Sequence, residues 1–428
     1  MKKWFLIIAA AILLCGCSQD REHILKVYNW SDYIDETVIA DFEEWYEEQT
    51  GEPVKVIYQT FDINETMLSK IEKGQEDFDV VCPSDYIIER MLQRDLLLPI
   101  NRDFGSTPDY IANVSQFVTG SFNKIEGAGK NANDYAVGYM WGTVGLIYNA
   151  AYVTDEEASS WNVLRNPKFE GKIFMKEDPR DVFSQILIYL RQAELQSGEV
   201  TMDELMLDSS DRSLADVEAF LKEVKPLVAG WEADFGKEQM ILERGWISLN
   251  WSGDGVWTRE QAAPLGVTLK FSFPKEGFTT FFDGWVIPKY AQNTKAANYW
   301  INFMNRPDIV IRNMEETGYV SCNAAPELLE AFSDENYDPV DLSYFFGPDA
   351  TAVRTDPVMY PDRSNIERAA MSHDWGDRTQ ALIEMWSSVK GDNANAMTII
   401  ILGIAVLALV AFSLSRVFKK TSKKHKRR

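Results

Sequence analysis

The sequence predicts an α/β protein of two lobes, each built on a mostly parallel sheet flanked by helices. Its 428 residues exceed what one hydrophobic core normally supports, so two domains, or two lobes sharing the chain, are expected. Segments of strand character alternate with segments of helical spacing through the first part of the chain. Such alternation favours parallel strands with ligand-binding loops at their carboxyl ends.

The first predicted unit is strand, helix, strand. Residues 24–30 and 54–60 are rich in Val, Ile and Tyr and are predicted strands. Between them, apolar residues recur at helical spacing and Gly51 provides a stop. The apolar residues of this helix are Val38, Ile39, Phe42, Trp45 and Tyr46.

Further elements follow in order along the chain. Helices are predicted at 64–73, 86–93, 182–196, 214–228 and 294–305, and strands at 78–82, 135–148, 246–251, 267–273 and 281–287. The remainder to about residue 390 is expected to be helical or irregular, and no repeat of 20 to 50 residues is present.

The charge is unevenly distributed. The formal net charge is -22, but the first 17 and last 33 residues contain no acid and ten basic groups. Residues 18–395 therefore carry 33 basic against 65 acidic groups, or -32. Such a field repels nucleic acid and attracts small cations.

The amino end has the features of an export signal. In residues 1–17, Lys2 and Lys3 precede an uncharged run too short to span a bilayer. The segment Leu14-Cys15-Gly16-Cys17 resembles the lipobox of bacterial lipoproteins, which would make Cys17 the lipidated first residue of the mature protein. An ordinary cleavage site nearby and an uncleaved anchor are the alternatives.

The carboxyl end predicts one transmembrane helix at 396–415. Residues 393–415 carry no charge, and the basic tail at 416–428 places that end in the cytoplasm by the positive-inside bias. A buried core helix is the alternative for the apolar run. The tail could be a nucleic-acid arm, but beside a spanning segment its partner is expected to be the anionic inner leaflet. These features predict a periplasmic protein anchored to the inner membrane by lipid at Cys17, by the helix, or by both.

Two cysteines remain after the signal, Cys82 and Cys322. An exported protein can form a disulfide between them, but spacing does not decide it, and two free, partly buried thiols are the default expectation.

Several enzyme classes lack the residues they need. The chain has three histidines, and only His373 lies away from both ends. Metal sites and catalytic triads that need histidine are therefore not expected. The stretch Gly127-Ala128-Gly129-Lys130 fails the spacing of a phosphate loop, and no GxSxG elbow is present. No cofactor and no metal are predicted.

Aromatic rings and carboxylates recur together at the ends of predicted strands. Four such clusters are Trp30-Ser31-Asp32-Tyr33, Ser84-Asp85-Tyr86, Trp251-Ser252-Gly253-Asp254 and Phe281-Phe282-Asp283. Ring faces attract ammonium groups and cover methylenes, while carboxylates accept charge-assisted hydrogen bonds, so the pattern indicates an organic cation as ligand. Taken singly, aromatics at strand ends are more often core and acids in loops are more often solvated.

These clusters and several longer stretches resemble the bacterial spermidine/putrescine-binding proteins, the solute receptors of polyamine ABC transporters. The matching stretches, all in one order and covering most of residues 24–390, are 27–34, 64–67, 78–81 with Pro83-Ser84, 139–143, 283–288, 302–308 and 316–319. The resemblance implies a two-lobed periplasmic-binding-protein fold of type II, with crossover strands joining the lobes and ligand bound as they close. It implies no enzyme activity, and its partners would be putrescine or spermidine and a membrane permease.

The resemblance implies the two lobes, lobe 1 at 24–140 and 279–320 and lobe 2 at 141–278 and 321–390. The charge and hydropathy of the ends add the signal at 1–17, the transmembrane helix at 396–415, which typical members of the family lack, and the tail at 416–428.

Position by position, the resemblance implies a ligand site with an aromatic box, an acid that grips one ammonium (Asp283) and two acids that reach the other end of the amine (Asp178 and Asp181). The full set of implied ligand-binding residues is Trp30, Ser31, Asp32, Tyr33, Ser84, Tyr86, Asp178, Asp181, Trp251, Asp254, Phe281, Asp283 and Tyr319.

Two departures bear on the ligand. Asp254 adds an acid near the middle of the cleft, and Phe281 takes a position where other members of the family have Trp. In both respects the sequence resembles the putrescine-preferring members, so putrescine is the favoured ligand, with spermidine close behind. The rival interpretations are a binding protein of the same fold for ferric iron or thiamine, and a hydrolase that uses Asp254 and Asp283 as a carboxylate pair.

Overall fold

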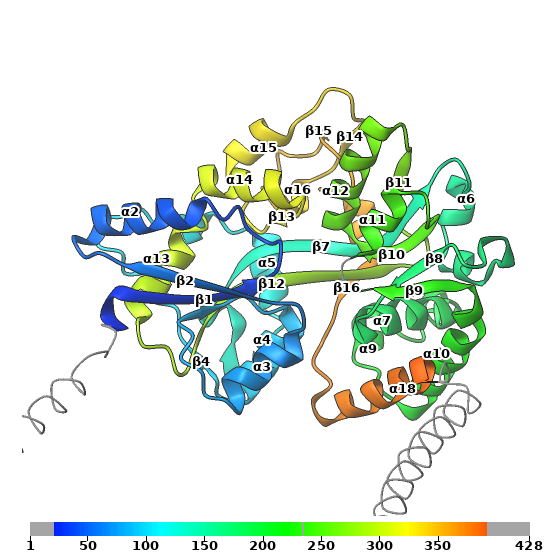
Figure 1. Cartoon of the computed structure of the whole chain (residues 1–428), viewed down its shortest axis with the longest axis horizontal. Helices are drawn as coiled ribbons and strands as arrows, with labels where there is room; N and C mark the ends of the chain where they lie inside the picture. The colour runs from blue at the N-terminus through cyan, green and yellow to red at the C-terminus, as the bar shows by residue number, and fades with distance from the viewer. Residues whose placement is uncertain (1–20, 233–234, 392–428) are drawn as a thin grey trace, which may run out of the picture.

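The computed structural model describes residues 21–232 and 235–391. Figure 1 shows two α/β lobes joined by the long strands β7 (Ala136–Asn149) and β12 (Phe278–Pro288), which run through the middle of the molecule. The two-lobed fold expected from the sequence is confirmed.

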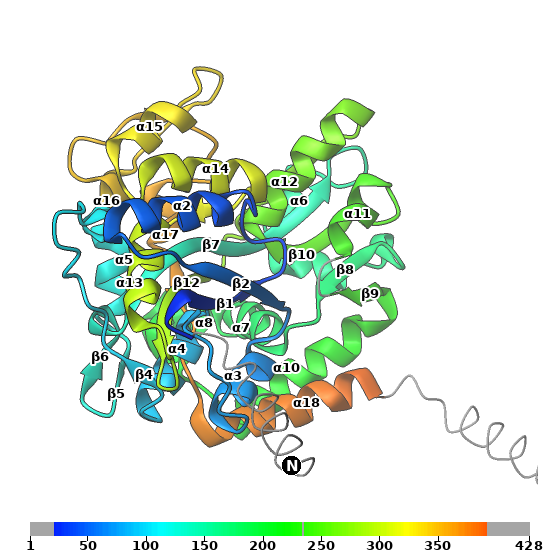
Figure 2. The ribbon, with the colours of Figure 1, turned by 60° about the vertical axis from the view of Figure 1, so that its left-hand side comes forward.

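The first lobe carries β1 (Ile24–Trp30), β2 (Lys55–Phe61), β3 (Val80–Val81), β4 (Leu97–Leu98) and β13 (Val320–Ser321). Its helices are α2 (Val38–Thr50), α3 (Asn64–Glu72), α4 (Asp85–Gln93), α5 (Gln116–Phe122), α13 (Thr294–Phe303), α14 (Pro307–Thr317), α15 (Pro326–Phe332) and α16 (Ser343–Phe346). Figure 2 shows α2 and α14 above the sheet and α3 below it.

The second lobe carries β8 (Ile173–Lys176), β9 (Val228–Glu232), β10 (Ile247–Trp251) and β11 (Leu269–Ser272), and β16 (Ala369–Met371) pairs with the nearby end of β12. Its helices are α6 (Asp155–Ala158), α7 (Pro179–Leu190), α8 (Gln192–Ser197), α9 (Met202–Met206), α10 (Asp211–Val224), α11 (Gly236–Ile241), α12 (Ser252–Ala262) and α18 (Thr379–Gly391).

One continuous sheet links the lobes in the order β2-β1-β3-β12-β7-β10-β8-β9. The first half of β7 pairs with β12, and its second half pairs with β10 and β11. Each end of β7 therefore belongs to a different lobe, and the site between the lobes is built around the middle of β7 and β12.

The sheets are less parallel than expected. The pairings within β2-β1-β3 and β10-β8-β9 and between β12 and β16 are parallel, whereas β12 pairs antiparallel with β3 and β7, and β7 pairs antiparallel with β10. The reason is that β7 leaves the first lobe and β12 returns to it, so the two neighbouring strands run in opposite directions.

Most predicted elements are present, with boundary shifts of a few residues. The first strand is β1 as expected, and Gly51 ends α2 in a left-handed conformation at φ 72°. The helix predicted at 182–196 is two helices, α7 and α8, and α7 begins earlier because Asp178 caps it and Pro179 is its first residue.

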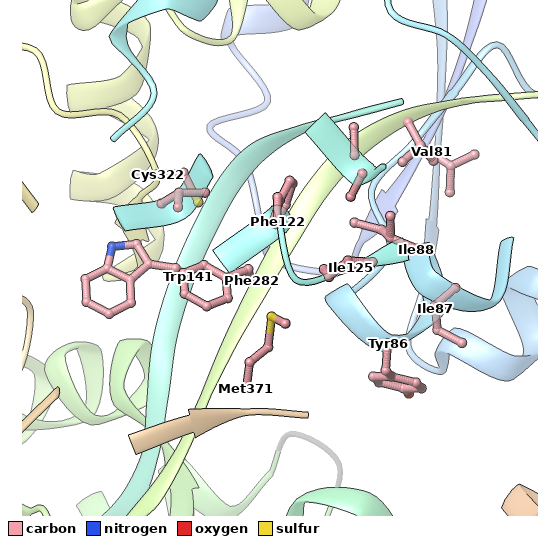
Figure 3. Packing of buried hydrophobic residues seen from close by; sticks show 14 of the residues in the cluster. Val81, Tyr86, Ile87, Ile88, Phe122, Ile125, Trp141, Phe282, Cys322 and Met371 are labelled. Carbon is pink, nitrogen blue, oxygen red and sulfur yellow. The ribbon is translucent and has the colours of Figure 1, made fainter. Parts of the chain in front are cut away.

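The expected placement of all of 321–390 in the second lobe is wrong. Cys322, Leu328, Phe345 and Tyr360 share a core with α4 and the first half of β7, while Trp375 and Trp386 pack in the core of the second lobe. Figure 3 shows part of the first core, in which Trp141 and Phe282 come from the two crossover strands, with ring centroids 6.0 Å apart and planes nearly parallel. The chain returns from the first lobe to the second only near β16. The carboxyl-terminal part of the second lobe therefore begins later in the sequence than expected.

Three further expectations concern the ends and the cysteines. Within residues 21–232 and 235–391, no helix has the length and apolar character that crossing a membrane requires. The predicted signal at 1–17, with Cys17, and the predicted transmembrane helix at 396–415 lie outside the described residues. Cys82 and Cys322 are both buried and free, as the default expectation had it.

Candidate functional site

A cavity of about 110 Å³ lies between the lobes, beside the middle of the crossover strands. All the residues that the sequence predicted as ligand-binding line it: Trp30, Ser31, Asp32, Tyr33, Ser84, Tyr86, Asp178, Asp181, Trp251, Asp254, Phe281, Asp283 and Tyr319. This volume is below the ~300–1,000 Å³ typical of drug-sized sites, so the cavity suits a small ligand.

The rim on the first lobe is the turn after β1. Trp30 ends the strand and packs on Phe61 at 4.5 Å between ring centroids, and Asp32 adopts the left-handed conformation at φ 52°. This turn leaves Ser31 and Asp32 exposed at the rim and directs Tyr33, which is buried, toward the crossover strands.

Asp283 on β12 lies at the base of the cavity. Its carboxylate accepts hydrogen bonds from Tyr33 Oη at 2.8 Å and Ser84 Oγ at 2.6 Å, and the residue is only 5% exposed. Burial raises the pKa of Asp283 to about 6, although both hydroxyl donors lower it. Across the described part of the chain, no Lys, Arg or His forms an ion pair with this carboxylate.

Aromatic rings form the walls around Asp283. Tyr319 meets Tyr33 edge-on at 4.9 Å between centroids, and Phe281 lies 6.3 Å from Tyr319 and 6.5 Å from Trp251. The Tyr319 ring also packs against the backbone of Gly253. Only glycine allows this contact, because a Cβ at that position would lie 2.4 Å from the ring. These rings line the cavity together with the carboxylates and give its wall an apolar surface.

The second lobe contributes Asp181 from the first turn of α7. Its carboxylate accepts a hydrogen bond from Trp251 Nε1 at 2.7 Å, and burial, together with the nearby Asp178, raises its pKa to about 7. Asp178 itself caps α7, since its Oδ1 accepts from the backbone N–H groups of Arg180 and Asp181 at 2.8 and 3.1 Å. Within the described ranges neither acid forms an ion pair, and Asp181 is the one of the two whose carboxylate accepts no backbone N–H group.

Asp254 differs from Asp283 and Asp181 in having lysine partners. Its Oδ2 lies 3.1 Å from Lys176 Nζ, and its Oδ1 lies 3.7 Å from Lys237 Nζ and accepts a hydrogen bond from Tyr319 Oη at 3.1 Å. Burial alone would raise the pKa of Asp254, but the two lysines outweigh it and bring the pKa below its usual value. Asp254 is thus an ionised carboxylate that the protein itself neutralises.

Sequence reasoning missed five lining residues: Asn64, Asp85, Arg180, Lys237 and Ser372. Asn64, Asp85 and Arg180 stand inside or beside the stretches that were singled out, whereas no signal in the sequence marks Lys237 or Ser372. Arg180 crosses the cleft, because its guanidinium lies 4.3 Å from the centre of the Tyr86 ring on the first lobe and its Nη1 donates to the His373 carbonyl at 2.7 Å.

Burial disfavours ionisation of two cavity tyrosines, Tyr33 and Tyr86. Burial raises the pKa of Tyr33 and of Tyr86 well above the usual value, with Asp283 and Glu65 respectively as the next cause, so both phenols resist the ionisation that ferric coordination needs. A search of the described ranges for clusters of three or more His, Cys, Asp or Glu arranged to hold a metal ion finds none.

Comparison with known proteins gives consistent matches. Residues 38–336 match the family described as bacterial extracellular solute-binding protein. The chain is 27% identical over 395 residues to the spermidine/putrescine-binding periplasmic protein of Escherichia coli, covering 91% of this chain and 99% of that protein. It is 28% identical over 361 residues to the putrescine-binding periplasmic protein PotF of the same organism, covering 80% and 91%.

A solved structure adds a match in three dimensions. The spermidine/putrescine ABC transporter substrate-binding protein PotD of Streptococcus pneumoniae superposes with a TM-score of 0.63 at 26% identity, covering 86% of this chain and 98% of that one.

Proposed function

Because the chain belongs to the bacterial extracellular solute-binding protein family, we propose that it is the polyamine receptor of an ABC transporter, which captures putrescine or spermidine outside the inner membrane. The observation that carries the proposal is Asp283, a buried carboxylate without a cationic partner in residues 21–232 and 235–391, enclosed by the rings of Tyr33, Tyr319 and Phe281. An ammonium group with an apolar body is the ligand that such a pocket favours.

The relatives support this choice. One Escherichia coli relative and the Streptococcus pneumoniae protein are named for spermidine and putrescine, and PotF of Escherichia coli is named for putrescine. Each is matched over more than 90% of its length.

The mechanism is capture without bond making. One ammonium of the ligand pairs with Asp283 and the other with Asp181, while the rings cover the methylenes between them. Removing water from the closed cavity strengthens each of these electrostatic contacts. Asp283 lies on the crossover strand β12 and is held by Tyr33 and Ser84 of the first lobe, whereas Asp181 belongs to the second lobe, so a ligand that pairs with both favours the closed arrangement.

Closure also supplies the signal for delivery. Arg180 on α7 reaches Tyr86 on α4 across the cleft, so the relative position of the lobes is coupled to the residues around the ligand. A permease that recognises only the closed lobes would then receive loaded receptors in preference to empty ones.

We also propose that the receptor is held at the inner membrane, by lipid at Cys17, by the apolar segment 396–415, or by both. Tethering raises the effective concentration of the receptor beside its permease. Extraction of membranes with alkaline carbonate tests the spanning segment: a spanning protein stays in the pellet, and release into the supernatant would contradict it.

The rival ligands fit the cavity less well. Ferric iron needs ionised tyrosines, which burial disfavours here. A carbohydrate hydrolase would have Asp283 as the protonated acid and Asp254 as the ionised partner, and their pKa values do differ in that sense. However, two lysines already hold Asp254, and about 110 Å³ leaves little room for an oligosaccharide.

A thermal-shift panel tests the proposal. Putrescine, spermidine, thiamine, ferric citrate and a set of oligosaccharides are each added at pH 8. At about 100 times its dissociation constant, a bound polyamine stabilises the folded state by about 2.7 kcal/mol, which is a rise of several degrees in melting temperature. Stabilisation by one of the other compounds and by no polyamine would overturn the assignment.

A further inference from the structure

Lys176 occupies a position with every feature of a site for a ligand's ammonium group. Its Nζ lies 3.9 Å from the centre of the Trp251 ring, 3.1 Å from Asp254 and 3.3 Å from Glu232. Its side chain is 1% exposed, and those of Glu232 and Asp254 are 0% and 6% exposed. A cation from the chain itself therefore already takes the aromatic face and the carboxylates at this end of the cavity.

Lys237 completes the arrangement from the cavity side. Lys176 meets Oδ2 of Asp254, while Lys237, which lines the cavity, lies 3.7 Å from Oδ1. Both oxygens of the carboxylate thus face lysines of this chain. A ligand ammonium that approached Asp254 would meet the charge of Lys237 rather than an unpaired carboxylate.

The remaining acids of the cavity leave room for two cations. Asp85 accepts two backbone N–H groups, Asp178 caps α7, and Asp32 lies exposed at the rim. Only Asp283 and Asp181 are cavity carboxylates with raised pKa values, no ion pair within the described residues and no backbone donor.

We propose that Lys176 and Lys237 set the length of the polyamine that this receptor accepts, by occupying Asp254 and so removing the place for a third ammonium. The inference rests on the proposed polyamine function. It makes the protein a receptor for diamines of the size of putrescine that discriminates against triamines such as spermidine.

The discrimination is measured by titration calorimetry of putrescine and spermidine with the wild-type protein, with Lys237→Met, and with Lys176→Met combined with Glu232→Gln. The second change in the double variant removes the buried carboxylate that would otherwise lose its partner, and Met fills the volume of the Lys stem. Lys172→Met is the matched control, because it removes one charge from the same lobe at a residue that does not line the cavity.

The wild type is expected to bind putrescine at least about tenfold more tightly than spermidine, and each lysine variant to shift that ratio toward spermidine by about tenfold, as for a gained ion pair. Adding Asp254→Asn to Lys237→Met should abolish the shift, and Lys172→Met should leave the ratio unchanged.

Three results would overturn the inference. If the wild type binds spermidine as tightly as putrescine, the lysines do not set ligand length. If both lysine variants keep the wild-type ratio, the discrimination has another source. If the wild type binds neither amine, the proposed polyamine function itself fails, and the inference fails with it.

Discussion

At the residue scale, Asp283 combines burial with hydroxyl donors and no cationic partner within residues 21–232 and 235–391. Asp283→Asn should therefore weaken putrescine binding by roughly 30- to 5,000-fold, the range for losing one partner of a desolvated charge pair. The melting temperature of the ligand-free protein should hold or rise, because burial disfavours the charge.

Asp62→Asn is the control for this substitution. Asp62 is exposed, accepts a hydrogen bond from Ser31 Oγ at 2.7 Å and does not line the cavity. Its replacement by Asn therefore removes one negative charge close to the site without changing the cavity itself. Equal losses of affinity in the two variants would mean that Asp283 acts only through long-range charge.

The pKa values of the cavity acids predict how binding depends on pH. Burial raises the pKa of Asp283 to about 6 and that of Asp181 to about 7, so both carboxyls take up protons as the pH falls from 8 toward 5. An ammonium ligand binds the ionised forms, so affinity is full only above about pH 8 and is lost as the pH falls through these values, by about tenfold per pH unit for each protonated group. Affinity that stays constant from pH 8 to pH 5 would contradict this assignment of cation sites.

The sequence predicted which residues form the site, but not which of their carboxylates are neutralised by lysines. The four clusters of rings and acids at predicted strand ends supplied most of the predicted lining, because strand ends meet at one edge of a sheet. The family resemblance supplied Asp178, Asp181 and Tyr319. The neutralisation of Asp254 was not predictable, since Lys176 and Lys237 reach it from β8 and α11, far from it in sequence and with no recognisable motif.

At the scale of elements, the first turn of α7 positions Asp181. Asp178→Ala should lower the unfolding free energy by about 0.5–2 kcal/mol through loss of the helix cap, and should also weaken putrescine binding because Asp181 loses its support. Melting curves and calorimetry measure the two effects.

Ser210→Ala separates these effects. Ser210 caps α10 by accepting from the backbone of Ser213 at 3.2 Å and does not line the cavity. The Ser210→Ala substitution should lower the unfolding free energy by a similar amount without changing the affinity for putrescine. A loss of affinity in both variants would mean that the stability of the whole protein, rather than the first turn of α7, controls binding.

The elements themselves were largely predictable, and their partners were not. Strand character in 24–30 and helical spacing in 38–46 are local properties that the chain retains in the fold. The direction in which β7 and β12 pair, and the return of residues 322–360 to the first core, depend on contacts far apart in sequence, and no local pattern records them.

At the scale of the molecule, acidic side chains line a hollow beside the cavity, which we expect to be the entrance for the ligand. This hollow of about 610 Å³ adjoins the cavity, shares Asp32 and Asp254 with it and is lined by the acids Asp35, Glu36, Glu238 and Glu316. With a net charge of -22 for the whole chain, this entrance should steer cations toward the site.

Replacing Glu36, Glu238 and Glu316 together by Gln should slow association with putrescine several-fold at low salt, with little change in the dissociation rate, and should reduce the salt dependence of association. Stopped-flow fluorescence measures both rates. The same three-charge change at the exposed Glu156, Glu199 and Glu330 is the control, and an equal effect there would assign steering to net charge rather than to the entrance.

The most direct test of the central claim is titration calorimetry of putrescine into the wild-type protein at pH 8. A single saturable site, strongly weakened by Asp283→Asn, is the predicted result. Absence of saturable binding of both putrescine and spermidine by the folded protein would contradict the assignment of this cavity as a polyamine site.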